Sequence, residues 1–170
     1  CSSDLIGTSS PEYWWANQFD NMSNFQSHFT TTGPEIFKQM DGDVDYFVSA
    51  AGTGGTLSGV STFLKTMNPK TKTTLVDPVG SGLLNYVKTG IFPTDMPYAY
   101  TMIEGVGITR LVENFKKNQV DDAMTINDQL VASLAYYLKE KEGLVMGMSS
   151  MLNVAGAFTQ ALKAPKGSRI

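Results

Sequence analysis

A glycine-rich stretch in the first half of the chain has the composition of a phosphate-binding loop. Residues 52–56 read Gly-Thr-Gly-Gly-Thr, and they follow a short apolar, β-rich run at 44–48. Glycines let the backbone turn inward with no Cβ in the way. The amides at the start of the helix expected next point outward, and the helix dipole favours an anion there. The stretch therefore predicts a small molecule whose phosphate is held by Gly52, Thr53, Gly54, Gly55 and Thr56.

Taken alone, this loop is also compatible with two other interpretations. A tight strand–helix turn without any ligand would have the same glycines. A dinucleotide site, as in an NAD-dependent enzyme, is a sharper rival, because Asp77 ends the next expected strand, where a ribose-binding acid would lie. The third glycine of that fingerprint falls on Leu57, which counts against it. A nucleotide P-loop is excluded, since no Lys-Ser or Lys-Thr pair follows the glycines.

Other residues that could do chemistry have simpler interpretations. The Ser149–Ser150 pair lacks the glycine pattern of a nucleophile elbow and has no evident base. Cys1 is the single cysteine and His28 the single histidine, which excludes an internal disulfide and most metal sites. The aspartates near 41–45 and 121–122 are typical of solvated turns. We therefore expect no metal site.

Composition narrows the class of protein. The chain has 170 residues, of which 42% are hydrophobic and 17% are charged, as in a globular domain with a substantial core. The net charge of −3 and the absence of a basic stripe argue against a nucleic-acid partner. No apolar run reaches the length that spans a bilayer, so we expect no membrane association.

Strands and helices are expected to alternate around these residues. This order predicts an α/β fold, a mostly parallel sheet with helices on both faces in three layers, with ligands beyond the carboxyl ends of the strands. The glycine loop and residues 147–150 occupy that position. Strands are expected at 44–50, 73–78, 123–126 and 144–147, helices at 34–40, 57–67, 83–87, 111–115, 128–142 and 151–162, and loops at 20–31 and 91–100.

A spaced set of motifs resembles the cysteine synthase and cystathionine β-synthase family. These are pyridoxal-phosphate (PLP) enzymes of the tryptophan synthase β-like fold, fold type II. The resemblance covers nearly all of 11–170, and the set is far more specific than the glycine loop by itself. It is carried by Gln18-Phe19-Asp20-Asn21, His28, Thr31-Thr32-Gly33-Pro34-Glu35-Ile36, residues 52–59, Val76-Asp77-Pro78, residues 104–108 and Gly147-Met148-Ser149-Ser150.

The resemblance implies a role for each matching residue. Gly52, Thr53, Gly54, Gly55 and Thr56 correspond to the loop around the PLP phosphate. Ser149 corresponds to the partner of the pyridine nitrogen. A neutral hydroxyl there leaves that nitrogen unprotonated, which suits β-elimination and replacement. Gln18 corresponds to a contact of the substrate carboxylate, and Gly105 and Gly107 to a loop lining the cleft.

Each of these roles has a plainer alternative. Ser149 would serve equally as a helix N-cap, Gln18 as a surface amide, and Gly105 and Gly107 as turn glycines. His28 matches a position that is structural in the family.

Two departures from the family pattern bear on activity. The Schiff-base lysine lies on a motif that is absent here, so no catalytic residue is assigned in this chain, and the fragment alone is expected to be inactive. The family commonly has glycine after the two serines, where this chain has Met151, which we expect to narrow the space beside the cofactor ring.

The resulting hypothesis concerns a longer parent protein. It is a PLP-dependent enzyme that forms L-cysteine from an O-activated serine and sulfide, with a small amino-acid substrate. Alternatives are cystathionine β-synthase, a serine or threonine dehydratase, and a non-catalytic ligand-binding module. The resemblance implies a homodimer and an intracellular location, cytoplasmic or mitochondrial. We expect 1–10 to be a non-native or disordered leader, since one frame of a common sequencing adapter translates as Cys-Ser-Ser-Asp-Leu. Residues 11–170 are expected to be the phosphate-binding C-terminal part, truncated at both ends.

Overall fold

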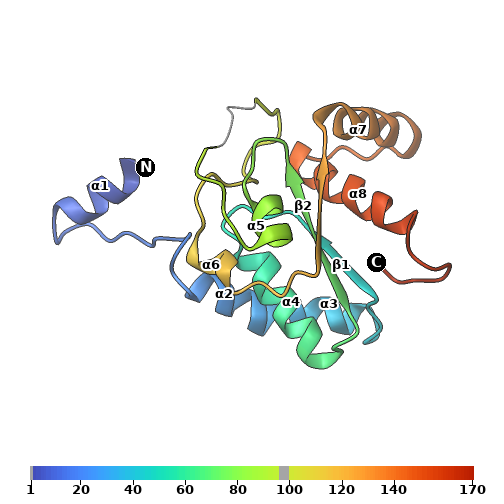
Figure 1. Cartoon of the computed structure of the whole chain (residues 1–170), viewed down its shortest axis with the longest axis horizontal. Helices are drawn as coiled ribbons and strands as arrows, with labels where there is room; N and C mark the ends of the chain where they lie inside the picture. Colours follow the sequence, from blue (N-terminus) through green and yellow to red (C-terminus); the bar gives the residue numbers. More distant parts are fainter. Residues whose placement is uncertain (1, 96–99) are drawn as a thin grey trace.

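The computed structural model describes residues 2–95 and 100–170 as a parallel sheet between two layers of helices (Figure 1). Three strands lie in the order β1-β2-β3, and both pairings are parallel, with Phe47 opposite Thr73 and Leu75 opposite Ala123. The strands are β1 (Tyr46–Ser49), β2 (Lys72–Pro78) and β3 (Asp122–Ile126). The helices are α1 (Ser2–Ser9), α2 (Ser23–Ser27), the π-helix η1 (His28–Thr32), α3 (Gly33–Gln39), α4 (Gly55–Met67), α5 (Leu83–Thr89), α6 (Glu113–Lys116), α7 (Asp128–Glu142) and α8 (Met148–Ala161).

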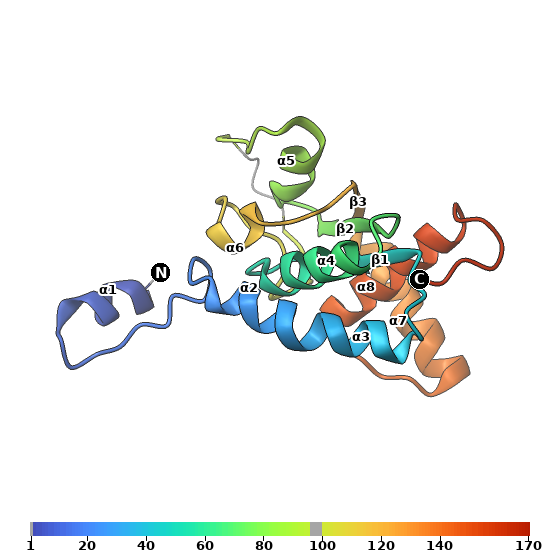
Figure 2. The ribbon, with the colours of Figure 1, turned by 90° about the horizontal axis from the view of Figure 1, so that it is seen from below.

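The two faces of the sheet can be followed from two neighbours on β2. Leu75 and Val76 point to opposite faces, as successive strand residues do, and both are fully buried. Leu75 packs with Leu57 of α4 and with α5 and α6, whereas Val76 packs with α7 and α8. Figure 2 shows α4 and α8 on either side of β1. The three-layer α/β fold expected from the sequence is therefore confirmed.

Helix α8 approaches the sheet closely because it carries a glycine at the contact. A Cβ on Gly156 would lie 2.2 Å from Val76 Cγ2, so no larger residue fits without a shift. The same helix contacts all three strands. It therefore forms most of one covering layer.

The expected loop at 20–31 is wrong. Residues 23–39 form a nearly continuous helical run through α2, η1 and α3. Phe25 and Phe29 stack with ring centroids 6.1 Å apart, and Phe29 meets Phe63 of α4 edge-on at 5.9 Å. Tertiary packing of these aromatic side chains overrides the loop-like composition of Asn, Ser and Thr. Because the chain is already helical at Thr32, this residue makes no side-chain cap for α3.

The expected buried strand at 144–147 is also wrong. Leu144, Val145 and Met146 form no strand and are 50%, 78% and 38% exposed. An apolar run forms a strand only when its backbone groups pair with a neighbouring strand, and these residues pair with none and instead link α7 to α8. Met146 therefore does not fill the core, whereas Met151 does.

The amino-terminal segment differs from expectation as well. Ser2–Ser9 form helix α1, where the polar composition predicted disorder, while residue 1 lies outside the described residues. Gly7 lets Trp15 approach, since a Cβ on Gly7 would lie 2.4 Å from Trp15 Cβ. Trp14 is 83% exposed. Whether this leader is native stays a prediction.

The remaining elements agree with the sequence to within a few residues. Asn127 caps α7 by accepting from the Leu130 amide at 2.9 Å, and Gly143 ends that helix with a φ of 68°. The helix expected at 111–115 begins only at Glu113. The expected loop at 91–100 is irregular at 91–95, and 96–99 lie outside the described residues. No helix in the described part of the chain is long and apolar enough to cross a membrane.

Candidate functional site

The glycine loop lies at the carboxyl end of β1 and leads directly into α4. Gly54 is the N-cap of α4 and has a φ of 84°, which side chains rarely tolerate. A Cβ there would lie 2.8 Å from the Phe115 Cα, and a Cβ on Gly52 would lie 2.4 Å from the Gly105 carbonyl oxygen. The glycines are therefore required by close approaches of backbone on two sides.

The first turn of α4 offers a set of neutral donors. Its first amides have no partner within the helix, and the turn contains no acidic residue. Thr56 is exposed, and its hydroxyl lies 3.1 Å from His28 Nε2. His28 Nδ1 lies 2.9 Å from the hydroxyl of Thr32, so the imidazole bridges η1 and α4. The amides and the Thr56 hydroxyl can attract an anion, and no acidic side chain in this turn would repel one.

The hydroxyl of Thr53 is held differently from that of Thr56. Its oxygen accepts hydrogen bonds from Asn24 Nδ2 at 2.9 Å and from the Gly55 amide at 3.3 Å. A hydroxyl has one proton of its own besides its lone pairs. With the oxygen serving as acceptor, the Thr53 proton stays available to an incoming acceptor.

Gln18 is brought next to the glycine loop by its backbone. Its carbonyl oxygen accepts from Asn24 Nδ2 at 2.8 Å and from Asn114 Nδ2 at 2.9 Å. The residue itself is exposed. The structure thus places Gln18 one side chain away from Thr53.

The second glycine pair also meets the loop. The Gly107 amide donates to the Ala51 carbonyl at 2.8 Å. Gly105 and Gly107 have φ values of 77° and 82°, and a Cβ on Gly107 would lie 2.6 Å from Pro78 Cγ. Two candidate segments that are about 50 residues apart in sequence are therefore in direct contact.

Ser149 lies in the first turn of α8, whose N-cap is Gly147. The alternative role of Ser149 as the N-cap is therefore wrong, because the helix begins at Met148 and its N-cap lies two residues before Ser149. Asn153 ties this turn to the glycine loop: its Nδ2 donates to the Ser149 carbonyl at 2.8 Å, and its Oδ1 accepts from the Ala50 amide at 2.7 Å. Ser149 is partly exposed, so its hydroxyl can be reached.

Asp77 does not offer its carboxylate to a ligand. It is fully buried at the end of β2, and its Oδ2 accepts from the Leu84 amide at 2.8 Å. Burial raises the pKa of this carboxyl to about 6, although hydrogen bonds from the Ser81 hydroxyl and the Leu84 amide lower it. The ribose-binding role considered for a dinucleotide site is therefore wrong, since the carboxylate caps α5 instead.

Three asparagines and one histidine connect the site, and the sequence pattern predicted a binding role for none of them. Asn24, Asn114 and Asn153 each donate or accept across segments that are far apart in the chain. His28 joins Thr32 to Thr56. Their only sequence signal is position beside the recognised motifs, because carboxamide pairings over long separations leave no local pattern.

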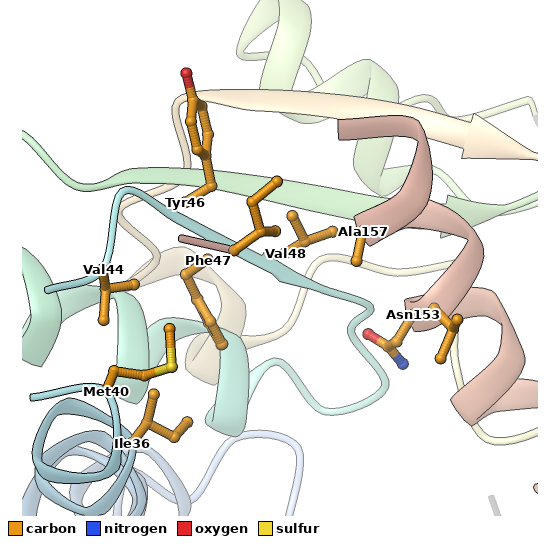
Figure 3. Close-up of a pocket in the computed structure, with 10 residues that line it drawn as sticks. Ile36, Met40, Val44, Tyr46, Phe47, Val48, Asn153 and Ala157 are labelled. Atoms are coloured by element: carbon orange, nitrogen blue, oxygen red, sulfur yellow. The ribbon is translucent and has the colours of Figure 1, made fainter. Parts of the chain in front are cut away.

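An apolar pocket of about 290 Å³ lies elsewhere, between α3, β1 and α8 (Figure 3). None of its lining residues is charged, so it is unsuited to a phosphate or a carboxylate. Its walls come from Ile36, Met40, Val44, Tyr46, Phe47, Val48, Asn153, Val154, Ala157 and Ile170. The glycine loop remains the candidate site.

The fold and the loop define an α/β protein with an anion-binding strand–helix turn, and comparison with known proteins gives the family. A family model described as "pyridoxal-phosphate dependent enzyme" matches residues 5–170. The chain belongs to this family of PLP-dependent enzymes. Within the part of the chain that the structure describes, no group of three potential metal-ligating side chains was found.

Individual relatives narrow the similarity. A cysteine synthase of Dictyostelium discoideum is 43% identical over 92% of this chain and 43% of its own length. An O-acetylserine-dependent cystathionine β-synthase of Bacillus subtilis is 36% identical over 90% of this chain and 47% of its own. A solved structure with that same activity in its title, from Helicobacter pylori, superposes with a TM-score of 0.85 at 30% identity, covering 99% of this chain and 52% of that one. The chain thus spans about half the length of the proteins it matches.

Proposed function

We propose that this chain is part of a longer enzyme, here called the parent, that makes L-cysteine from an O-activated serine and sulfide with PLP as its cofactor. The observation that carries the proposal is the meeting of the glycine loop with Gln18, Gly107 and the first turn of α8 in one place. Cysteine synthases among the relatives support the choice of reaction. We propose further that residues 11–170 form its phosphate-binding part and that residues 1–10 are a leader.

The residues present fit a phosphate ester. Gly52 to Thr56 form a cradle that a Cβ at Gly54 or Gly55 would disrupt, since the latter would lie 2.0 Å from Asn24 Oδ1. The cradle offers backbone amides of the α4 start and the hydroxyls of Thr53 and Thr56. All of these donors are neutral, so the helix dipole and hydrogen bonds supply the attraction.

PLP, when bound, supplies an electron-withdrawing ring that stabilises negative charge at the substrate's α-carbon. Within this chain, Gln18 binds the substrate carboxylate through its side-chain amide. Ser149 would hydrogen-bond the ring nitrogen with its neutral hydroxyl and so would leave that nitrogen without a proton. Gly105 and Gly107 keep the wall of the cleft free of side chains.

Met151 has a different place from the one expected. It is 1% exposed and packs in the core with Val76 and Leu152. Its side chain therefore lies beneath α8, whereas Ser149 and Ser150 are accessible. We infer that Met151 supports α8 from below, so the expected narrowing of the space beside the ring is not supported.

The lysine that binds the cofactor aldehyde comes, in this proposal, from the part of the parent outside this chain. The chain alone is then inactive. We further propose that the parent is a homodimer that acts inside the cell. A homologous putative mitochondrial cysteine synthase of Saccharomyces cerevisiae keeps both cytoplasm and mitochondrion as candidate compartments.

A second candidate reaction uses a thiol amino acid in place of sulfide. The similarity to two O-acetylserine-dependent cystathionine β-synthases favours it specifically. The same chain residues would serve both reactions, since the activated serine is shared. The choice between sulfide and a larger thiol would then depend on the space beside Gly105.

The test is made on the purified parent. We expect visible absorbance of bound PLP, which borohydride reduction changes in the absence of substrate, and formation of cysteine from O-acetylserine and sulfide. Ser149→Asp should shift the absorbance spectrum and the ratio of replacement to elimination products. A parent that binds NAD but no PLP, or that turns over neither sulfide nor homocysteine, contradicts the proposal.

A further inference from the structure

One side chain touches both the candidate substrate residue and the phosphate loop. Asn24 Nδ2 donates to the Gln18 carbonyl at 2.8 Å and to the Thr53 hydroxyl at 2.9 Å. A carboxamide nitrogen has two hydrogens. Both hydrogens of Asn24 are therefore used, one for each half of the site.

A glycine on α4 admits this side chain. A Cβ on Gly55 would lie 2.0 Å from Asn24 Oδ1 and 2.4 Å from its Cγ. Glycine in the first turn of a helix costs stability relative to alanine. The structure thus has a glycine where contact with Asn24 requires one, and Asn24 is fixed against the start of α4.

A second carboxamide, that of Asn114, donates to the same carbonyl. Asn114 is fully buried, and its Nδ2 donates to the carbonyls of Gln18 and Phe19 at 2.9 and 2.8 Å. Its Oδ1 accepts from the Phe25 amide at 3.1 Å. Asn114 therefore connects the two ends of the segment 18–25, whereas Asn24 connects that segment to the phosphate loop.

We propose that Asn24 is a positioning residue that sets the distance between the substrate-carboxylate residue Gln18 and the phosphate-binding hydroxyl of Thr53. This inference rests on the function proposed above. By accepting from Asn24, the Thr53 oxygen directs its own proton toward the phosphate. By donating to the Gln18 carbonyl, the same amide holds the backbone from which the Gln18 side chain projects. Asn24 itself touches neither substrate nor cofactor in this scheme.

The experiment compares Asn24→Ala with wild type in the full-length parent. Losing two positioning hydrogen bonds should raise the KM for O-acetylserine about three- to tenfold while kcat changes less than about twofold. The dissociation constant of PLP, measured by absorbance titration of apoprotein, should rise by a similar factor. Asn85→Ala is the matched control, because Asn85 is an exposed carboxamide on α5 whose Nδ2 donates to the Ile91 carbonyl. It should leave both constants unchanged.

A double substitution tests whether Asn24 acts through Gln18. If it does, Gln18→Ala already loses the carboxylate contact, and adding Asn24→Ala should not raise the KM further. A merely structural role would instead lower the melting temperature and kcat without this dependence. Should Asn24→Ala fail to fold, Asn24→Asp keeps the shape of the side chain, loses both donors, and is expected to give the same rise in KM.

The outcomes separate the two proposals. A wild-type parent that binds no PLP refutes the proposed function. A wild-type parent that binds PLP, with unchanged KM and unchanged PLP dissociation constant in the Asn24 variants, overturns the positioning role alone. Additive effects of Gln18→Ala and Asn24→Ala on KM overturn it as well.

Discussion

The buried carboxylate of Asp77 should make the stability of the protein fall as pH rises. Burial raises its pKa from 3.8 to about 6 in the folded protein. Between pH 3.8 and about pH 6, the folded state therefore keeps a proton that the unfolded state has already lost. Stability from this group is fully present below about pH 3.8 and is lost as the pH rises through about 6. Since one pKa unit corresponds to about 1.4 kcal/mol, the ionised carboxylate costs about 3 kcal/mol at pH 8.

Asp77→Asn removes this dependence with little change of shape. The amide oxygen can still accept from the Leu84 amide, and the amide nitrogen can donate to the Ser81 hydroxyl. The test is to measure the free energy of unfolding of the variant and of the wild type in urea, by circular dichroism, at pH 4, 5, 6, 7 and 8. The difference, variant minus wild type, should rise by about 2.4 kcal/mol from pH 4 to pH 8, because the unfolded carboxyl is already partly ionised at pH 4. All other titrating groups are shared and cancel in this difference.

Asp122→Asn is the matched control on the neighbouring strand. A hydrogen bond from Lys88 lowers the pKa of Asp122. Its stabilisation is therefore present at neutral pH and is lost as the pH falls, which is the opposite sign. Because both side chains are about half exposed, the effect should stay below about 1 kcal/mol. If the Asp77→Asn difference is flat between pH 4 and pH 8, or falls, the reasoning about Asp77 is refuted.

Three further predictions concern the site and its support. Thr56→Val in the parent should weaken PLP binding by about 1.5–3 kcal/mol through the lost charge-assisted hydrogen bond, as measured by absorbance titration; unchanged affinity contradicts the phosphate cradle. Gly156→Ala should destabilise the protein by about 1–3 kcal/mol, since its Cβ would lie 2.2 Å from Val76 Cγ2. Adding Val76→Ala should relieve that clash, so the double variant should lose less unfolding free energy in urea than the two single variants together. A loss greater than that sum would contradict the clash. Asn114→Ala should cost roughly 3 kcal/mol by leaving buried backbone groups without partners, whereas a loss below about 0.5 kcal/mol would show that water replaces the carboxamide.

The sequence predicted those parts of the fold that depend on local pattern. The strand at 73–78, the helix after the glycine loop and the helix at 128–142 each have short-range signals, and each is confirmed. The segment 20–31 has polar composition, and its helices form because Phe25 and Phe29 pack on α4. Residues 144–147 have an apolar strand pattern but pair with no strand of the sheet. Both errors arise from contacts that no local window contains.

The candidate site divides in the same way. The glycine loop and its position after β1 follow from local composition and strand–helix order. Motif spacing led to Gln18 and Ser149, whose roles remain predictions. The carboxamides of Asn24 and Asn153 could not be found from sequence, since each bonds to a segment known to be adjacent only once the chain is folded.

The π-helical turn η1 sets how the run from α2 to α3 faces its neighbours. A π turn holds more residues than an α turn, so it acts as an inserted residue in an otherwise α-helical register. Phe25 in α2 and His28, the first residue of η1, lie against the first half of α4, and after η1 Gly33 and Phe37 meet Phe63 near the end of α4. Removing one residue within 28–32 would rotate one half of the run by about 100° against the other. The length of this segment is therefore constrained as tightly as its composition, because one helical run must present the His28 imidazole to Thr56 and its aromatic side chains to α4 at once.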